Sequence, residues 1–112
     1  MPTFHNAKRF SAGTKIALVD IDETICFYEG PRRYDLAIPN LDNIKKINDL
    51  FNLGWKITYW TSRGGTSGID YYEYTLDQLK GWGCQFTDLI CGKDKPFFDC
   101  VIDDKAKRIE EL

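Results

Sequence analysis

Short runs of apolar residues alternate with longer stretches in which apolar residues recur every three or four positions. The runs cover residues 15–21, 55–60, 86–91 and about 98–102, and each has the length of a β-strand. The first run, Lys-Ile-Ala-Leu-Val-Asp-Ile, is mostly apolar and partly β-branched, which is typical of a buried strand. The pattern therefore predicts a strand in each run.

Two of the intervening stretches have the spacing of an amphipathic helix. The first begins at Pro39-Asn40, where Asn40 is a suitable N-cap, and ends at Gly54. The second runs from about residue 69 to residue 82, and a short closing helix is expected over residues 105–112. The residues expected to face the core are Leu41, Ile44, Ile47, Leu50 and Phe51 in the first helix, and Ile69, Tyr72, Leu76, Leu79 and Trp82 in the second.

The order strand-helix-strand-helix-strand-strand-helix indicates the fold class. We expect an α/β, Rossmann-like three-layer sandwich, with a mostly parallel sheet of about four strands and helices on both faces. Residues 15–112 are expected to form one domain, preceded by an N-terminal extension over residues 1–14. The third and fourth strands are joined by about six residues, which is short for a crossover helix, so this connection is the least regular part of the predicted topology.

Composition narrows the classes of function. The 112 residues carry a formal net charge of −2, which gives no electrostatic reason to expect nucleic acid or an anionic membrane as a partner. No apolar run reaches the roughly 20 residues of a membrane span, and residues 1–13 lack the apolar stretch of a secretory signal. The four cysteines form no C-x-x-C pair and there is one histidine, so we do not expect a zinc site. We expect the cysteines to be reduced and the protein to be cytoplasmic.

Polar residues follow the predicted strands at the points where the strands end. The carboxyl ends of parallel strands meet at one edge of a sheet, so these side chains should converge. Any one of them alone fits an ordinary loop start, a helix cap or a solvated surface lysine. Their occurrence at successive strand ends instead favours a phosphate site. The residues are Asp20 and Asp22, Thr61 and Ser62, Lys95, and Asp103 and Asp104.

The chemistry of these groups is complementary. Carboxylates such as Asp20, Asp22 and Asp103 are hard oxygen ligands of the kind that Mg²⁺ prefers. The two aspartates beside Ile21 carry like charges, so the pair requires a cation or a shared proton. Hydroxyl groups and loop amides at positions 61 and 62, together with the ammonium group of Lys95, are suited to phosphate oxygens.

Together these residues resemble the motifs of the haloacid dehalogenase superfamily of aspartate-nucleophile phosphohydrolases. Residues 20–24, Asp-Ile-Asp-Glu-Thr, resemble its first motif, D-x-D-x-T, while Thr61 resembles the second, Lys95 the third and Asp103-Asp104 the fourth. More narrowly, the stretches 60–64, 75–83 and 95–106 resemble a group of short bacterial and phage members often associated with surface-polysaccharide genes. The resemblance covers about residues 15–106. It departs from the family at Glu23, where small residues are frequent, and Lys93 is a second candidate for the motif lysine, although Lys95, directly before Pro96, matches better.

The resemblance implies a Mg²⁺-dependent phosphatase with an aspartyl-phosphate intermediate. Asp20 would be the nucleophile, and Asp22 would protonate the leaving oxygen and then activate water. The residues implied to bind the metal are Asp20, Asp22 (through its backbone carbonyl) and Asp103. Those implied to bind phosphate are Thr61, Ser62 and Lys95. Asp104 and Thr24 would contact these residues and position them. Arg63 would either bind a second part of the substrate or brace its loop, and the sequence leaves both roles open.

Family members usually carry a cap domain after the first motif or between the second and third. Here those gaps are too short for one, so we expect no cap domain and an open site, partly covered by the segment 25–38. We expect the substrate to be a small phosphomonoester such as a sugar or polyol phosphate. A substrate of this size would favour a homo-oligomer in which a second subunit covers the site. A nucleotide or polynucleotide-end phosphatase is the alternative within enzymes, and a phospho-accepting regulatory domain is the alternative from another class.

Overall fold

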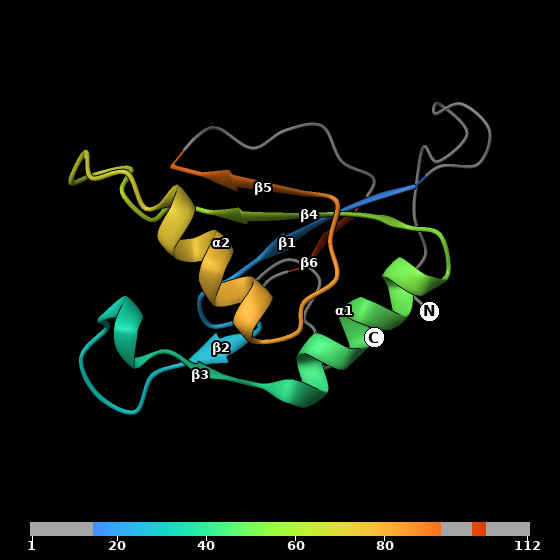
Figure 1. Ribbon diagram of the computed structural model, residues 1–112, viewed down its shortest axis with the longest axis horizontal. Helices are drawn as coiled ribbons and strands as arrows, with labels where there is room; N and C mark the ends of the chain where they lie inside the picture. The colour runs from blue at the N-terminus through green and yellow to red at the C-terminus, as the bar shows by residue number, and fades with distance from the viewer. Residues whose placement is uncertain (1–14, 93–99, 103–112) are drawn as a thin grey trace.

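The computed structural model describes residues 15–92 and 100–102. Its central feature is a parallel sheet in the order β5-β4-β1-β6, with β1 and β4 in the middle (Figure 1). In chain order the elements are β1 (Ile16–Asp20), β2 (Cys26–Phe27), η3 (Tyr34–Leu36), β3 (Ile38–Pro39), α1 (Leu41–Asn52), β4 (Lys56–Thr61), α2 (Tyr72–Gly81), β5 (Asp88–Cys91) and β6 (Cys100–Ile102). The described residues therefore form a small α/β fold of the Rossmann-like type.

The strand order contains one reversal of direction. From β1 the chain moves outward through β4 to β5, and it then returns to place β6 on the other side of β1. Such a reversal is a topological switch point, and in open α/β sheets the crevice beside it, at the carboxyl ends of the strands, is where ligands bind. In this chain the switch point lies between β1 and β6, directly beside Asp20.

Both α1 and α2 lie on the same face of the sheet (Figure 1). This follows from the topology, because successive crossovers of one hand that move in one direction place their helices on one side. The expectation of helices on both faces involves the closing helix over residues 105–112, which lies outside the described residues. The N-terminal extension over residues 1–14 also lies outside them.

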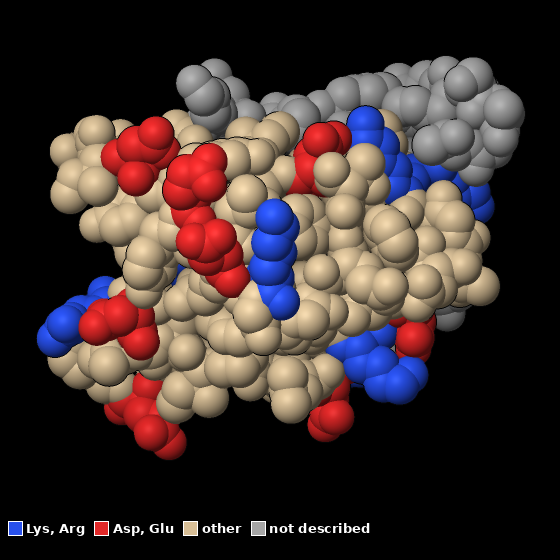
Figure 2. All heavy atoms as spheres, in the orientation of Figure 1, with Lys and Arg blue, Asp and Glu red and all other residues tan. Residues whose placement is uncertain are grey.

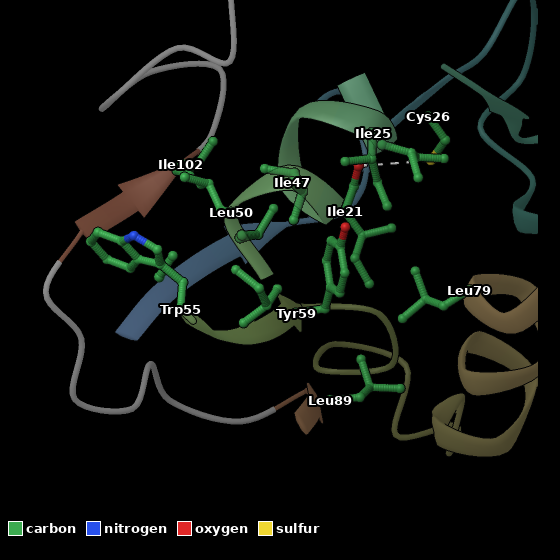
Figure 3. Close-up of a cluster of buried hydrophobic side chains, with 14 residues drawn as sticks. Ile21, Ile25, Cys26, Ile47, Leu50, Trp55, Tyr59, Leu79, Leu89 and Ile102 are labelled. Atoms are coloured by element: carbon green, nitrogen blue, oxygen red, sulfur yellow. Dashed lines mark hydrogen bonds between the residues drawn. The ribbon is translucent and has the colours of Figure 1, made fainter. Parts of the chain in front are cut away.

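The core fills the space between the two helices and this face of the sheet. Strand side chains that share the face through the sheet register meet helix side chains from α1 and α2 (Figure 3). Tyr59 packs its ring edge-on to Phe86, with the ring centroids 5.6 Å apart. The buried residues of this cluster include Ala17, Val19, Ile57, Tyr59, Leu89 and Ile102 from the strands and Ile44, Ile47, Leu50 and Leu79 from the helices.

Helix α1 begins as the sequence predicts. The Asn40 side chain accepts a hydrogen bond from the Asn43 amide at 3.0 Å, and Gly54, just past the end of the helix, has a φ of 99°. Ile44, Ile47 and Leu50 are buried as expected, but Leu41 is 65% exposed. The prediction for Leu41 is wrong: its side chain lies with those of Phe27 and Ile38 at a surface pocket rather than in the core.

Helix α2 is shorter than predicted. It begins at Tyr72 rather than near residue 69, after a loop in which Gly68 has a φ of 76° and Asp70 Oδ1 accepts a hydrogen bond from the Tyr72 amide at 2.9 Å. Ile69 and Tyr72 are exposed, contrary to the prediction, whereas Thr75 and Leu79 are buried. The Asp70 side chain holds the chain before Tyr72 in a turn, so the apolar spacing that suggested the earlier start continues into residues that are not helical.

The segment 25–38, which we call the flap, contains structure that the sequence does not reveal. β2 and β3 pair antiparallel through Cys26 with Pro39 and Phe27 with Ile38, and the single turn η3 lies between them. The Asn40 amide also donates to the Ile25 carbonyl at 2.8 Å. The root of the flap is therefore fixed to the sheet turn and to α1. In the described part of the chain, none of the helices is long and apolar enough to cross a membrane.

Candidate functional site

Asp20 is the last residue of β1, at the carboxyl edge of the sheet. Its Oδ1 accepts a hydrogen bond from the Ile21 amide at 2.9 Å, and the side chain is half-buried. A tight turn follows, in which the amides of Thr24 and Ile25 both donate to the Ile21 carbonyl. Glu23 has a φ of 67°, which is uncommon for a residue other than glycine and marks local backbone strain at this turn. The turn separates the surroundings of Asp20 from those of Asp22.

Asp22 is buried and ionised. Its Oδ1 accepts hydrogen bonds from Tyr28 Oη at 2.6 Å, from Arg63 Nη2 at 2.8 Å and from Cys26 Sγ at 3.5 Å, while Oδ2 accepts from Arg63 Nε at 3.0 Å. Burial by itself raises the pKa of this carboxyl group. The hydrogen bonds from Arg63 and Tyr28, together with the charge of Arg63, more than offset that effect, so the pKa of Asp22 lies below its usual value.

The partners of Asp22 respond in the opposite direction. Burial, followed by the negative charge of Asp22, raises the pKa of the Cys26 thiol to about 12. Burial and the hydrogen bond to Asp22 also raise the pKa of the Tyr28 hydroxyl. Both groups therefore remain protonated donors near neutral pH, and Cys26 has no thiolate character to act as a nucleophile.

Arg63 is the centre of this arrangement. Its side chain has no exposed surface, and its three guanidinium nitrogens make five contacts, which match the five donors of the group. Besides Asp22 and Tyr28, the acceptors are Gln78 Oε1 at 2.8 Å and Thr75 Oγ1 at 3.3 Å, both on α2. The guanidinium carbon also lies 4.3 Å from the ring centroid of Tyr34. The sequence left open whether Arg63 binds a substrate or braces its loop. This conformation fits the bracing role, because the guanidinium group has no donor left for a substrate.

The network also fixes the flap against α2. Gln78 Nε2 donates to the Tyr34 carbonyl at 2.7 Å while its Oε1 accepts from Arg63. Tyr28 and Tyr34 are both flap residues, so the flap is joined to the β1 turn and to α2 through Arg63. We refer to Asp22, Tyr28, Tyr34, Arg63, Thr75 and Gln78 as the arginine network.

Thr61 and Ser62 lie where β4 ends. Trp60 pairs with Asp20 in the sheet, so Thr61 stands one residue beyond the position next to Asp20. Its hydroxyl is buried and accepts a hydrogen bond from the Arg63 amide at 3.2 Å, and its carbonyl accepts from the Gly92 amide at 2.7 Å. The Ser62 side chain is exposed. The structure thus brings the β4 end beside Asp20 and holds it in a defined conformation.

Thr24 ties the β1 turn to α1. Its carbonyl accepts a hydrogen bond from Asn43 Nδ2 at 3.0 Å. Its hydroxyl is buried and finds no hydrogen-bond partner among the described residues. The backbone of Thr24 therefore has a structural role, and its hydroxyl has no assigned one.

The remaining predicted site residues, Lys95, Asp103 and Asp104, lie outside the described residues. The last described residue of β6, Ile102, pairs with Val19, so the chain leaves β6 at the same edge at which β1 ends. Within residues 15–92 and 100–102, no group of three histidine, cysteine, aspartate or glutamate side chains could hold a metal ion. The donor chemistry at the end of β1 still fits Mg²⁺, because Asp20 offers a carboxylate and the β1 turn offers backbone carbonyls.

Several members of the arginine network were not predicted as site residues. Thr75 and Gln78 lie on a helix more than ten positions from Arg63 in sequence, and Tyr28 and Tyr34 lie in an irregular segment. Tyr28 and Tyr34 were recognisable as aromatic residues close to the first motif. Nothing in local periodicity pairs any of them with an arginine, because the contacts form only when the flap folds onto α2.

Comparison with known proteins gives a fold. No protein-family model matches the chain, and no curated protein matches it. The chain is similar to the crystal structure of an MCSG target from Vibrio cholerae, with 25% sequence identity and a TM-score of 0.66. This similarity covers 87% of the present chain and 85% of that chain. It supports the Rossmann-like arrangement over most of the sequence and assigns no chemistry to the residues at the sheet edge.

Proposed function

We propose that this protein is a Mg²⁺-dependent phosphomonoester hydrolase that works through an aspartyl-phosphate on Asp20. The observation that carries the proposal is the position of Asp20, a carboxylate at the end of the central strand β1 and beside the switch point between β1 and β6. The resemblance of residues 20–24 to the D-x-D-x-T motif of the haloacid dehalogenase superfamily adds the chemical assignment.

In the first step, a carboxylate oxygen of Asp20 attacks phosphorus. A bond forms between that oxygen and phosphorus while the bond from phosphorus to the substrate's ester oxygen breaks, and the leaving oxygen takes a proton. Asp22 is the donor of that proton. In this conformation Arg63 holds Asp22 ionised, so Asp22 has to bind a proton before it can deliver one.

In the second step, water attacks the phosphorus of the aspartyl-phosphate. Asp22 accepts a proton from this water, the bond between Asp20 and phosphorus breaks, and inorganic phosphate leaves. Asp22 is ionised in this conformation, as a proton acceptor must be, but its oxygens accept from Arg63, Tyr28 and Cys26, so the water has to replace one of these contacts. Asp22→Asn should therefore slow turnover by about 10²–10⁴-fold, the usual contribution of general acid–base catalysis.

The binding groups follow from the same positions. Mg²⁺, when bound, would lower the charge repulsion between the Asp20 carboxylate and the phosphoryl oxygens. The residues proposed to hold it are Asp20, Asp22 through its backbone carbonyl, and Asp103. Ser62, the hydroxyl of Thr61 and the ammonium group of Lys95 would bind the phosphoryl oxygens as charge redistributes.

Release of inorganic phosphate from a panel of phosphorylated metabolites tests the activity. We expect release in the presence of Mg²⁺, loss of release with a chelator, and recovery when Mg²⁺ is restored. Purified wild-type protein that releases no phosphate from any ester at saturating Mg²⁺ would contradict the proposal. A stable phospho-aspartate without turnover would instead support the phospho-accepting regulatory domain.

The short connections that follow β1 and β4 in the described part of the chain lead to a second proposal, about assembly. Between β4 and α2 the described chain has only the loop over residues 62–71, and the flap follows β1. Tyr72 and Tyr74 are 38% and 42% exposed near this edge and could pack against a second subunit. We propose a homo-oligomer when the substrate is small. Light scattering that finds a strict monomer with high activity on a small phosphate ester would leave the flap as the lid and contradict this assembly.

A further inference from the structure

A pocket of about 640 Å³ lies at the carboxyl edge of the sheet, on the far side of β4 from Asp20. The residues that line it come from the segment 63–72, which leads into α2, and from the end of β5 with Gly92. We call it the tyrosine pocket and define it by Ile69, Tyr71, Tyr72, Leu89, Ile90 and Cys91. Its volume falls within the range of pockets that hold small organic ligands.

The lining of the tyrosine pocket is apolar and aromatic and carries little charge. Asp70 is its exposed acidic side chain, and Asp70 also accepts a hydrogen bond from the Tyr72 amide. Arg63 borders the pocket, but its guanidinium group is fully buried in the arginine network. Figure 2 shows acidic side chains gathered over α2 and the loop before it, where Asp70, Glu73 and Asp77 are exposed. A ligand group with a second negative charge would therefore be repelled here.

The aromatic wall is held in place before any ligand arrives. Tyr71 packs edge-on to Tyr34, with ring centroids 4.9 Å apart, and also to Tyr74 at 6.3 Å. The loop is folded tightly at Gly64, where φ is 84° and a Cβ atom would collide with the Ile69 carbonyl oxygen. Only glycine fits at this position, so the loop places Ile69 and Tyr71 with little freedom. A preorganised aromatic wall is suited to stacking against a flat ring.

The distance from Asp20 sets the shape of a molecule that would reach both places. Asp20 pairs with Trp60, and Trp60 pairs with Ile90, so Ile90 lies two strand spacings, or about 10 Å, from Asp20. The buried Thr61, proposed to bind phosphoryl oxygens, lies on the strand between them. A ring bonded directly to the phosphate oxygen is too short for this distance, whereas a ring carried on a spacer can span it.

We propose that the tyrosine pocket binds an uncharged aromatic ring of the substrate, carried on a short spacer from the phosphate, as in a nucleoside 5′-monophosphate. This inference rests on the proposed function and specifies its substrate class. It favours a nucleotide over the sugar or polyol phosphate that the sequence resemblance suggested. Four observations support the proposal. They are the apolar aromatic lining, the buried Arg63 guanidinium group, the acidic Asp70 and the distance from the pocket to Asp20.

Binding of adenosine, which has the ring and spacer but no phosphate, tests the pocket without any activity. In two-dimensional NMR spectra of labelled wild-type protein, we expect shifts of the amides in residues 64–72 and 89–92. Shifts confined to other residues, such as those around Arg32 and Arg33, or no shifts at millimolar adenosine, would overturn the proposal. Because adenosine cannot be hydrolysed, this result does not depend on whether the protein is a phosphatase.

Kinetics on adenosine 5′-monophosphate, phenyl phosphate and glucose 6-phosphate supply the second arm. We expect the lowest KM for the nucleotide, by about tenfold, since stacking of a base on an aromatic side chain has about this value. Ile69→Asp should remove this preference, because it adds a charge to an exposed position of the pocket. The matched control is Leu53→Asp, which adds the same charge at a side chain that is 70% exposed beyond the end of α1 and should leave the preference intact.

The outcomes separate the two proposals. Adenosine shifts on the pocket amides without phosphate release from any ester would support the pocket and contradict the phosphatase. Phosphate release with equal KM values for nucleotide and sugar phosphate would support the phosphatase and overturn the pocket. A low KM for phenyl phosphate equal to that for the nucleotide would contradict the spacer, because both rings would then reach the pocket.

Discussion

Two kinds of arginine–carboxylate pair occur in this small protein at nearly the same distance and in opposite surroundings. Arg63 and Asp22 are 2.8 Å apart, with side-chain exposures of 0% and 9%. In the flap, Arg33 and Asp35 are 3.0 Å apart, with exposures of 67% and 53%. The length of an ion pair therefore says little about its role. The buried pair joins the β1 turn to α2 and the flap, whereas the exposed pair joins residues two positions apart.

The difference has an energetic reason. Removing one partner of a buried pair leaves the other charge without compensation in a poorly hydrated site, which is costly. An exposed pair loses little, because water and salt replace the partner. The arginine network should therefore act as a single structural unit that holds the Asp22 carboxylate and joins the β1 turn, the flap and α2, whereas the exposed pair of Arg33 and Asp35 should not.

The largest expected effect is the loss of Arg63. Arg63→Met should lower the free energy of unfolding by about 3–5 kcal/mol, because Asp22 remains buried without its cation. Arg33→Met, the matched control, should cost less than about 1 kcal/mol. Urea denaturation at pH 7 measures both. If Arg63→Met does not fold, Arg63→Lys, which keeps the charge and loses the bidentate contact, takes its place. Equal losses for the buried and exposed variants would contradict the comparison.

The second test uses acid, in metal-free buffer. Because the folded-state pKa of Asp22 is depressed, its ionisation contributes stability that is present above the unfolded value near 3.8 and is lost as pH falls through the folded pKa. Urea midpoints measured from neutral pH down to strongly acidic pH should therefore fall in the wild type. Asp22→Asn should flatten this acid dependence, whereas Asp35→Asn should retain it. An unchanged acid dependence in Asp22→Asn would show that other carboxyl groups cause it.

A smaller effect is expected where the network meets the flap. Gln78→Leu removes the hydrogen bonds to Arg63 and to the Tyr34 carbonyl, which should cost about 1–3 kcal/mol because both partners lose an acceptor or donor. The substitution should speed hydrogen exchange of the flap amides more than it speeds exchange of the α1 amides. Flap exchange equal to that of the wild type would mean that β2, β3 and the tyrosine contacts hold the flap without Gln78.

The smallest effect concerns the hydroxyl of Thr24. Thr24→Val has the same shape and removes a buried hydroxyl group for which the described residues provide no partner, so it should change stability by less than about 1 kcal/mol or improve it. Chemical denaturation gives the value directly. A loss of more than about 2 kcal/mol would indicate that this hydroxyl does bind a partner.

The sequence predicts the regular parts of this fold because the apolar residues of each helix and longer strand follow a recognisable pattern. The apolar runs at 15–21 and 55–60 become β1 and β4, and the helical spacing around Ile44 and Ile47 becomes α1. The flap strands are missed because two residues are too few to display alternation. The start of α2 is missed because the apolar spacing begins at Ile69, in a loop where the Asp70 side chain accepts a hydrogen bond from the Tyr72 amide.

The candidate site likewise has a part that the sequence predicts and a part that it does not. The placement of Asp20 and Thr61 at neighbouring strand ends follows from parallel topology and could be predicted. The capture of Asp22 by Arg63 could not, because these residues are 41 positions apart and meet only through the folded turn. The sequence thus predicts which strand ends meet, while the contacts that govern the charge of Asp22 required the three-dimensional structure.

The central claim is that Asp20 is the nucleophile, and trapping of the phosphorylated protein tests it most directly. Wild type, Asp20→Asn and Asp22→Asn are mixed with a substrate ester and Mg²⁺, quenched in acid, and digested for peptide mass spectrometry. We predict a phosphoryl group on Asp20 that accumulates in Asp22→Asn, because its water-activating carboxylate is gone, and that is absent from Asp20→Asn. Folded Asp20→Asn protein that releases phosphate at the wild-type rate, with no phosphoryl group on Asp20 in any variant, would contradict the claim.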